Sequence, residues 1–462
     1  MLAKLKKKYI GDWDFYQKYL LLAIPMILQN AITNLVSFLD NIMVGQLGTE
    51  QMSGVAIVNQ LIFVYNLAIF GAVSAASIFG AQYFGKGNHK GHMYSFRFKL
   101  YATLLVTGGA ILLFLTKGSA LISLYLTDTV GNGATDLALQ YGLEYLAIMM
   151  VGLIPFAVNQ SYATNIKETG QTLIPMLASF VAVGTNAILD YLMIFGIGPF
   201  PELGVQGAAL ATVIARYIEA LIVVIWAHIH RGKNRYLEGA YTGFGIPLAE
   251  LKAILIKGFP LMMNEVLWAA GMTTVTQCYS VRGLDVVAGL NIASTITNLF
   301  NIVYLQLGSC ISIVVGQYLG GGKLEDAKDA DNKMIVFSVF CCVIMAVLMF
   351  VVGGFFPGIY NTTEEIKTLA TSFIAVSAII MPFCAFSHAS YFTLRSGGKT
   401  VVTFLFDSVF TWVIVVPAAY LLAHFTGLGI VSIYFLVQGT ELIKVIIGYL
   451  MVKSNVWVVQ MV

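Results

Sequence analysis

Eight charged side chains lie within stretches of the sequence that are otherwise apolar: Asp40, Asp190, Arg216, Glu219, Glu265, Asp407, Glu441 and Lys444. If these stretches cross a bilayer, a charge at the centre of a helix costs at least about 2.5–3.5 kcal/mol. Ionisable residues at such depth usually bind ions or solutes, or relay protons. These eight residues are therefore the first candidates for function.

Asp190 ends the segment TNAILD, and Asn186 precedes it by four residues. This spacing places both side chains on one face of a helix. A carboxylate with an amide oxygen suits a hard cation such as Na⁺, or a proton if the carboxylate is desolvated. The alternative is a polar pair that holds two helices together.

Asp40 lies late in the first apolar stretch, fifteen residues after Pro25. A proline inside a helix removes a backbone hydrogen bond and favours a kink. A kinked helix that carries a carboxylate would be a plausible moving part. The alternative is that Asp40 is an interfacial residue at the bend before VGQLG.

Glu265 follows Pro260 in GFPLMMNEVLW, and Trp268 follows three residues later on the same helix face. A carboxylate beside an aromatic ring suits an organic cation, through charge and cation–π attraction. The alternative is a Glu that packs between helices beside an interfacial Trp. Asp407 has no charged neighbour in the sequence and is a second-half candidate for binding substrate or a cation.

The remaining four charges form two pairs at a spacing of three residues, Arg216 with Glu219 and Glu441 with Lys444. Side chains three apart are neighbours on a helix surface. We predict that each pair neutralises itself.

The composition identifies the class of protein that holds these charges. Of the 462 residues, 58% are hydrophobic and 11% are charged, against about 25% charged in soluble domains. Apolar stretches of roughly 20 residues or more span a bilayer as helices, and they lack the alternation of membrane strands. We predict an all-α integral membrane fold with twelve spans, at about 16–44, 55–83, 95–116, 138–165, 171–195, 205–229, 250–281, 287–318, 334–356, 367–394, 400–424 and 428–452.

The distribution of Lys and Arg predicts the orientation. With both termini in the cytoplasm, 21 of the 26 Lys and Arg residues fall in cytoplasmic segments and 3 in outside loops, as cytoplasmic loops require. Arg97 and Lys99 are counted in one of those segments, and His92 is predicted to lie in a loop. The net charge of +3 follows from this sidedness and does not indicate nucleic-acid binding.

The second half of the chain repeats the first. Pro25 matches Pro260 at an offset of 235 residues, and the same offset aligns GAQYFGKG (80–87) with VGQYLGGG (315–322). Further on, GQT (170–172) matches GKT (398–400), and Glu219 matches Glu441. Parallel repeats of this kind place a cavity between two bodies that rock about it. We predict an amino-terminal lobe at 1–230, a cytoplasmic linker at 231–249 and a carboxy-terminal lobe at 250–462, each lobe with six helices.

Signals for soluble chemistry are missing from the sequence. It contains no GxxxxGK[ST] phosphate-binding motif, no metal-spaced His cluster and no paired C-x-x-C, and its five cysteines lie in apolar stretches. We expect neither an enzyme nor a cofactor.

The segments IPMILQN, LDNIMVGQLG, GAQYFGKGN, NIKETGQT, TNAILD and GVQGAALATVIA, with GFPLMMNE, VGQYLGGGK and LRSGGKT in the second half, resemble the multidrug and toxic compound extrusion (MATE) family, prokaryotic type. The resemblance spans all twelve predicted helices. It implies a cation site at Asp40, Asn186 and Asp190, with Ala208 and Thr212 on the sixth span. It also implies a second-lobe role for a seventh-span Glu, here Glu265.

The resemblance further implies an antiporter of the prokaryotic cell membrane that exports organic, mainly cationic solutes in exchange for Na⁺ or H⁺. We expect a monomer with no nucleic-acid partner. The alternative is a flippase for lipid-linked oligosaccharides from the same superfamily. A flippase would need a basic cavity for phosphates, whereas carboxylates outnumber bases among the eight buried charges.

Overall fold

The computed structural model describes residues 9–126, 132–243 and 245–462. These residues form helices connected by turns and contain no strand. Among them, twelve helices are long and apolar enough to cross a membrane. The predicted all-α, twelve-span fold is confirmed.

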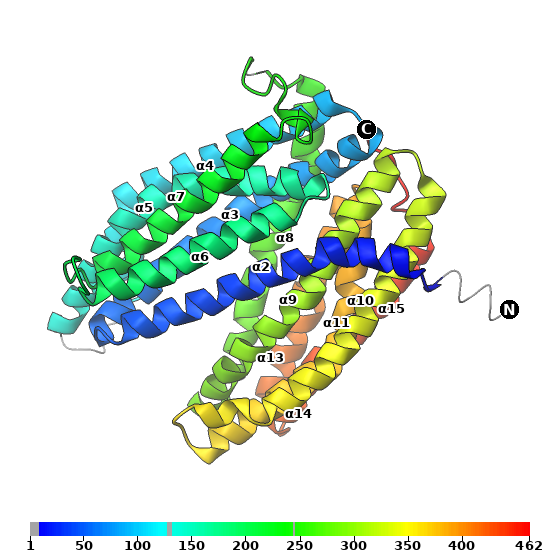
Figure 1. Cartoon of the computed structure of the whole chain (residues 1–462). Coiled ribbons are helices and arrows are strands. Elements are labelled where there is room, and N and C mark those ends of the chain that lie inside the picture. The colour runs from blue at the N-terminus through cyan, green and yellow to red at the C-terminus, as the bar shows by residue number, and fades with distance from the viewer. Residues whose placement is uncertain (1–8, 127–131, 244) are drawn as a thin grey trace. The chain divides into compact units, whose positions relative to one another are not determined.

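The helices of the first half are mostly longer than the predicted apolar stretches. They are α2 (Trp13–Gly45), α3 (Thr49–Lys86), α4 (His89–Ser123), α5 (Asn132–Glu168), α6 (Leu173–Ile194) and α7 (Val205–Ile229) (Figure 1). Pro25 lies inside the continuous helix α2, and Pro155 lies inside α5.

The second half begins after a short 3-10 turn, η1 (Arg235–Leu237). Its regular helices are α8 (Leu248–Ser280), α9 (Leu284–Gly320), α10 (Leu324–Gly353) and α11 (Glu364–Ser396), with the turn η2 (Phe356–Ile359) between the last two. The eleventh span is composite, and consists of α12 (Thr400–Phe404), two π-helical segments η3 (Leu405–Val409) and η4 (Thr411–Val415), and α13 (Val416–Phe425). The twelfth comprises α14 (Ile430–Gly439) and α15 (Glu441–Lys453).

The chain divides into two compact units. The amino-terminal unit comprises Leu28–Gly80 and His89–Lys252, and the carboxy-terminal unit comprises the residues up to Ile27 together with Ala81–Asn88 and Ala253–Val462. Helix α2 therefore contributes to both units, and the division falls two residues after Pro25.

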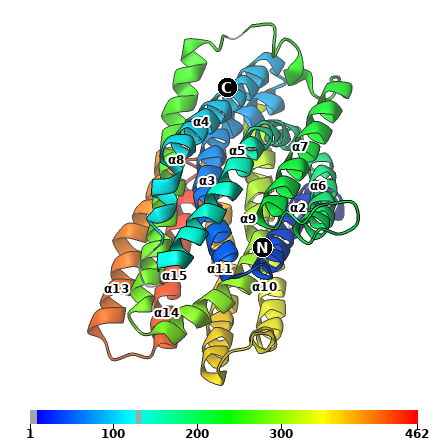
Figure 2. The ribbon, with the colours of Figure 1, turned by 90° about the vertical axis from the view of Figure 1, so that its left-hand side faces the viewer.

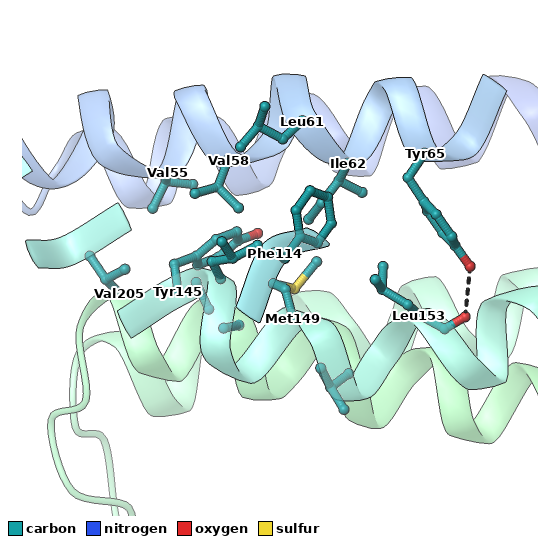
Figure 3. Packing of buried hydrophobic residues seen from close by; sticks show 14 of the residues in the cluster. Val55, Val58, Leu61, Ile62, Tyr65, Phe114, Tyr145, Met149, Leu153 and Val205 are labelled. Atoms are coloured by element: carbon teal, nitrogen blue, oxygen red, sulfur yellow. Dashed lines mark hydrogen bonds between the residues drawn. The ribbon is translucent and has the colours of Figure 1, made fainter. Parts of the chain in front are cut away.

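In the amino-terminal unit, α3, α4, α5 and α7 enclose a cluster of buried apolar side chains (Figure 3). Tyr65 lies at one end of the view, where its hydroxyl donates to the Leu153 carbonyl at 3.0 Å. Tyr145 lies within the same packing and is 5% exposed. Since lipid is as apolar as these side chains, close van der Waals contact stabilises the cluster.

In the carboxy-terminal unit, α11 is the central helix. It packs against α9, α10, α14 and α15, and α10 also packs against α9 (Figures 1 and 2). The first part of α2 joins this packing, since the Tyr19 hydroxyl donates to the Leu307 carbonyl at 2.9 Å. Tyr16 also stacks on Phe337, with ring centroids 4.7 Å apart.

The ends of α3 and α9 cross within the carboxy-terminal unit, and the contact is reciprocal. A Cβ on Gly85 would overlap the main-chain carbonyl of Gln317, and a Cβ on Gly320 would overlap that of Gln82. The two contacts correspond to each other through the same 235-residue offset that the sequence repeat shows. Only glycine allows the two backbones to approach this closely.

Residues 455–462 pack beside this crossing. The Gln82 side chain donates to the carbonyls of Ser396 (2.9 Å) and Val459 (3.2 Å), and accepts from the Met461 backbone N–H at 2.8 Å. Trp457 is 1% exposed. The segment after α15 is therefore part of the packed carboxy-terminal unit.

The prediction that His92 lies in a loop is wrong, because α4 already begins at His89. Lys99 is 0% exposed and lies 2.5 Å from Glu168, while His92 lies 3.4 Å from the same carboxylate. Arg97 is 6% exposed and donates to the carbonyls of Gly239, Ala240 and Gly245 in the linker. The linker is thus docked on the amino-terminal unit through its backbone.

Candidate functional site

The carboxyl groups of Asp40 on α2 and Asp190 on α6 lie close enough in the amino-terminal unit to influence each other's charge. Asp190 is 0% exposed. Its two oxygens make no well-directed hydrogen bond to a donor in the described chain, and neither does Oδ1 of Asp40. Two carboxylates this close repel each other unless a proton or a cation lies between them.

Among the described residues, no Lys, Arg or His forms an ion pair with Asp40 or Asp190. The nearby guanidinium of Arg216 is directed elsewhere, since it donates to the Gly152 carbonyl at 3.4 Å and lies 5.1 Å from the Phe156 ring centroid. Within the described residues, the charge of this pair is therefore not balanced by an ion pair.

Asn186 and Thr212 lie next to the pair, as the resemblance implies. Asn186 is 6% exposed, adjoins Asp190 one turn earlier on α6, and donates to the Thr212 hydroxyl of α7 over a long 3.5 Å. Ala208, one turn before Thr212, is 4% exposed. The structure thus brings together Asp40, Asn186, Asp190 and Thr212 from three helices.

The sequence analysis missed Tyr145 of α5. Its ring is buried, it lies close enough to Asp40 and Asp190 to be influenced by their charges, and its hydroxyl donates to Asn59 Oδ1 at 3.3 Å. A single Tyr in an apolar helix gives no sequence signal of its own, because tyrosines are abundant throughout this chain.

A second polar chain in the amino-terminal unit was also missed. Gln29 Nε2 donates to Ser179 Oγ at 2.8 Å, and the Ser179 hydroxyl donates to Glu219. Glu219 was expected to pair with Arg216, but no ion pair forms between them. The helix spacing permitted that pair, whereas a hydroxyl on the neighbouring helix α6 provided the nearer partner.

In the carboxy-terminal unit, Glu265 on α8 is partly buried, and Arg395 and Asp407 are close enough to influence its charge. Trp268 is 38% exposed. The two candidates share a helix, but no ion pair in the described chain involves Glu265.

Asp407, which has no charged neighbour in the sequence, has partners on other helices in the structure. Lys444 Nζ lies 2.6 Å from Asp407 Oδ1, and Asn264 Nδ2 donates to Oδ2 at 3.0 Å. The expected pairing of Lys444 with Glu441 is therefore wrong. Lys444 reaches across to η3, because a carboxylate on a facing helix offers better geometry than one three residues back on its own helix.

Comparison with known proteins places these sites in a family context. The family model described as MatE matches residues 25–192 and 260–421. A probable multidrug resistance protein NorM of Thermotoga maritima is 23% identical over 413 residues, which cover 89% of this chain and 86% of that protein. The protein of the same name from Halalkalibacterium halodurans is 24% identical, with 89% and 88% covered.

Solved structures share the fold. A MOP superfamily transporter from Pyrococcus furiosus superposes with a TM-score of 0.85 at 20% identity, covering 97% of each chain. A multidrug resistance MATE family transporter described in an outward-facing conformation gives the same TM-score and identity, covering 96% of each chain.

Proposed function

Because the chain belongs to the MatE family of multi-pass membrane transporters, we propose that it is a secondary antiporter that exports organic, mainly cationic solutes in exchange for Na⁺ or H⁺. The observation that carries this proposal is the carboxylate pair Asp40–Asp190, which forms no ion pair with any described residue. The names of the relatives, probable multidrug resistance proteins, support efflux as the direction and organic solutes as the cargo.

The coupling cation binds between Asp40 and Asp190 in this proposal. A proton needs only one desolvated carboxylate, so the pair alone suffices. A Na⁺ ion needs about six oxygen contacts, by analogy with other hard cations, and Asn186 and Thr212 add two protein oxygens to the carboxylates. The site is compatible with either ion, and the amide and hydroxyl favour testing Na⁺ first.

Coupling to transport follows from the position of Asp40. It lies on the part of α2 that belongs to the amino-terminal unit, whereas the residues up to Ile27 belong to the carboxy-terminal unit. A cation that holds Asp40 against Asp190 therefore favours one arrangement of α2 around Pro25. If bound solute favours another arrangement, each ligand displaces the other by shifting one equilibrium.

The flippase alternative is less well supported. Anionic phosphates would need unpaired buried bases, but Lys444 is neutralised by Asp407. Of the two basic residues among the eight candidates, this leaves only Arg216 to bind a phosphate. Glu219 lies close enough to offset part of the positive charge of Arg216. The prevailing charge at these sites is negative, which suits a cationic cargo.

We also propose that the chain acts as a monomer in the cell membrane with both termini in the cytoplasm. Residues 1–230 and 250–462 would form its two transport lobes, and residues 231–249 their linker. The solute site would include Glu265 and Trp268.

The direct test measures efflux of a fluorescent organic cation from proteoliposomes, with Na⁺ and H⁺ gradients imposed separately. Asp190→Asn is expected to abolish gradient-driven efflux under either ion, while the solute still binds the variant in detergent. Asp136→Asn, which changes an exposed carboxylate on α5, is the matched control and should export normally. Wild-type efflux by Asp190→Asn under both gradients would overturn the proposed coupling site.

A further inference from the structure

The carboxy-terminal unit contains an ion pair that the proposed transport cycle does not use. Lys444 Nζ lies 2.6 Å from Asp407 Oδ1, with side chains 9% and 16% exposed. Asp407 Oδ2 accepts from Asn264 Nδ2 at 3.0 Å. Both oxygens of Asp407 are thus engaged, one of them by a cation that belongs to the protein.

The carboxylate is held in place from two helices. Asn264 Oδ1 accepts from the backbone N–H of Ser408 at 3.2 Å and from its hydroxyl at 2.7 Å. The Ser408 hydroxyl also lies 2.8 Å from the Asn264 carbonyl. Asp407 itself belongs to η3, a π-helical segment, and such segments occur frequently at functional sites.

The ammonium group lies in surroundings typical of a bound cation. Besides Asp407 Oδ1, Lys444 Nζ lies 5.3 Å from the Phe406 ring centroid, within cation–π range. Glu441, one turn earlier on α15, adds negative charge. A carboxylate oxygen, an aromatic face and a second carboxylate together surround one positive charge.

The first half of the chain provides an internal comparison. By the repeat offsets, Asn264 corresponds to Gln29, Asp407 to Ser179, Glu441 to Glu219 and Lys444 to Ile222. The amino-terminal unit keeps the amide and the Glu, joined through the Ser179 hydroxyl. It has no counterpart of the Asp407 carboxylate or of the Lys444 ammonium group. The second half therefore contains both of these charges, and the first half contains neither.

We propose that Asp407, Phe406 and Asn264 form a monovalent-cation site, specific for a primary ammonium group, whose permanent occupant is the side chain of Lys444. The carboxy-terminal unit carries its cation covalently, whereas the amino-terminal unit takes its cation from solution at Asp40–Asp190. Only the amino-terminal unit would then exchange its cation with the solution. This last point rests on the proposed function, whereas the assignment of Lys444 as the occupant of the Asp407 site does not depend on it.

The test is chemical rescue of Lys444→Ala, which removes the ammonium group and leaves space for a small amine. The midpoint temperature of thermal unfolding, measured on the purified variant in detergent, is expected to fall by about 5–10 °C, because the largely buried carboxylate of Asp407 loses its partner. Ethylammonium chloride should restore at least half of this loss, and an equal concentration of N-methyl-D-glucamine chloride, whose cation is too bulky, should not. In Asp407→Asn/Lys444→Ala, ethylammonium should give no such gain.

Rescue that is equal for both salts, or that persists in the double variant, would overturn the proposal. If Lys444→Ala does not fold, Asp407→Asn/Lys444→Met provides a second test. It replaces both charges at similar volume and should retain ion-driven efflux with unchanged ion dependence. Loss of that dependence would show that the pair itself exchanges ions. Since the rescue is read from unfolding, it is independent of whether Asp190→Asn transports.

Discussion

The carboxyl groups of Asp40 and Asp190 meet although 150 residues separate them in the sequence. Neither is neutralised by a cation from the described chain, whereas the buried carboxylates Asp407 and Glu168 are both paired with lysines. This difference separates the proposed coupling site from carboxylates that already have a cationic partner within the chain. The predictions below test both kinds.

Thr212→Val removes a hydroxyl next to the carboxylate pair and keeps the side-chain volume. If Na⁺ is the coupling ion, the Na⁺ concentration that gives half-maximal efflux should rise by about tenfold or more, as when an oriented group near a metal ion is lost. Efflux driven by H⁺ should change little. Thr185→Val is the control, because Thr185 is partly exposed on α6 and its hydroxyl donates to the Val181 carbonyl. Equal effects of both substitutions would remove Thr212 from the site.

Glu265→Gln removes a negative charge from α8 without changing its shape. Transport of a cationic probe should weaken by about tenfold in apparent affinity, the equivalent of about 1.4 kcal/mol, while a neutral probe of similar size is affected less. Asp285→Asn, at an exposed position in the first turn of α9, should affect neither. Equal losses for both probes would show that Glu265 has a structural role.

Lys99→Met leaves Glu168 buried without its closest cation. Removing one partner of a buried ion pair costs about 3–5 kcal/mol, so the unfolding temperature in detergent should fall clearly. Lys90→Met, an exposed position on the same helix, should change it little. The double variant Lys99→Met/Glu168→Gln should recover part of the loss. No recovery would indicate that the pair acts through its packing and not through its charge.

Gly320→Ala places a methyl group on the main-chain carbonyl of Gln82 at the crossing of α3 and α9. We expect a loss of about 1–3 kcal/mol in the free energy of unfolding, since a backbone must shift to admit it. Gly109→Ala is the matched control, because a Cβ there meets no neighbouring atom within 4 Å and replaces a helical glycine. That variant should be as stable as the parent, or more stable by about 0.5–1 kcal/mol.

The sequence was sufficient to predict the twelve membrane-capable helices, for physical reasons, while the cation site at the carboxylates stays a prediction. Long apolar segments have few alternatives to membrane helices. Asn186 and Asp190 share a helix face, and the family resemblance added Asp40 and Thr212 from other helices. Contacts between helices were much less predictable. The partner of Lys444 depends on where η3 lies, and helix spacing alone wrongly favoured Glu441.

The charges near the ends of helices were also misjudged, and for a different reason. Counting Lys and Arg residues places Lys99 at the cytoplasmic start of the span predicted at 95–116, but the helix here already begins at His89. Lys99 therefore lies inside α4 with Glu168 beside it. No hydropathy pattern marks such a lysine as buried, because its burial depends on a carboxylate at the end of another helix.

The reciprocal crossing of Gly85 with Gln317 and Gly320 with Gln82 also bears on how such a chain arises. Gly320 is the repeat equivalent of Gly85, and Gln317 is the repeat equivalent of Gln82. A pair of reciprocal contacts of this kind is also found at the interface of a symmetric dimer. Two separate copies of an ancestral half could have associated through it before their genes fused. In such a dimer every mutation appears twice, so a new charge is introduced in both halves at once. Fusion removes that constraint, and a lone carboxylate with a lone lysine, as at Asp407 and Lys444, becomes available to one half only.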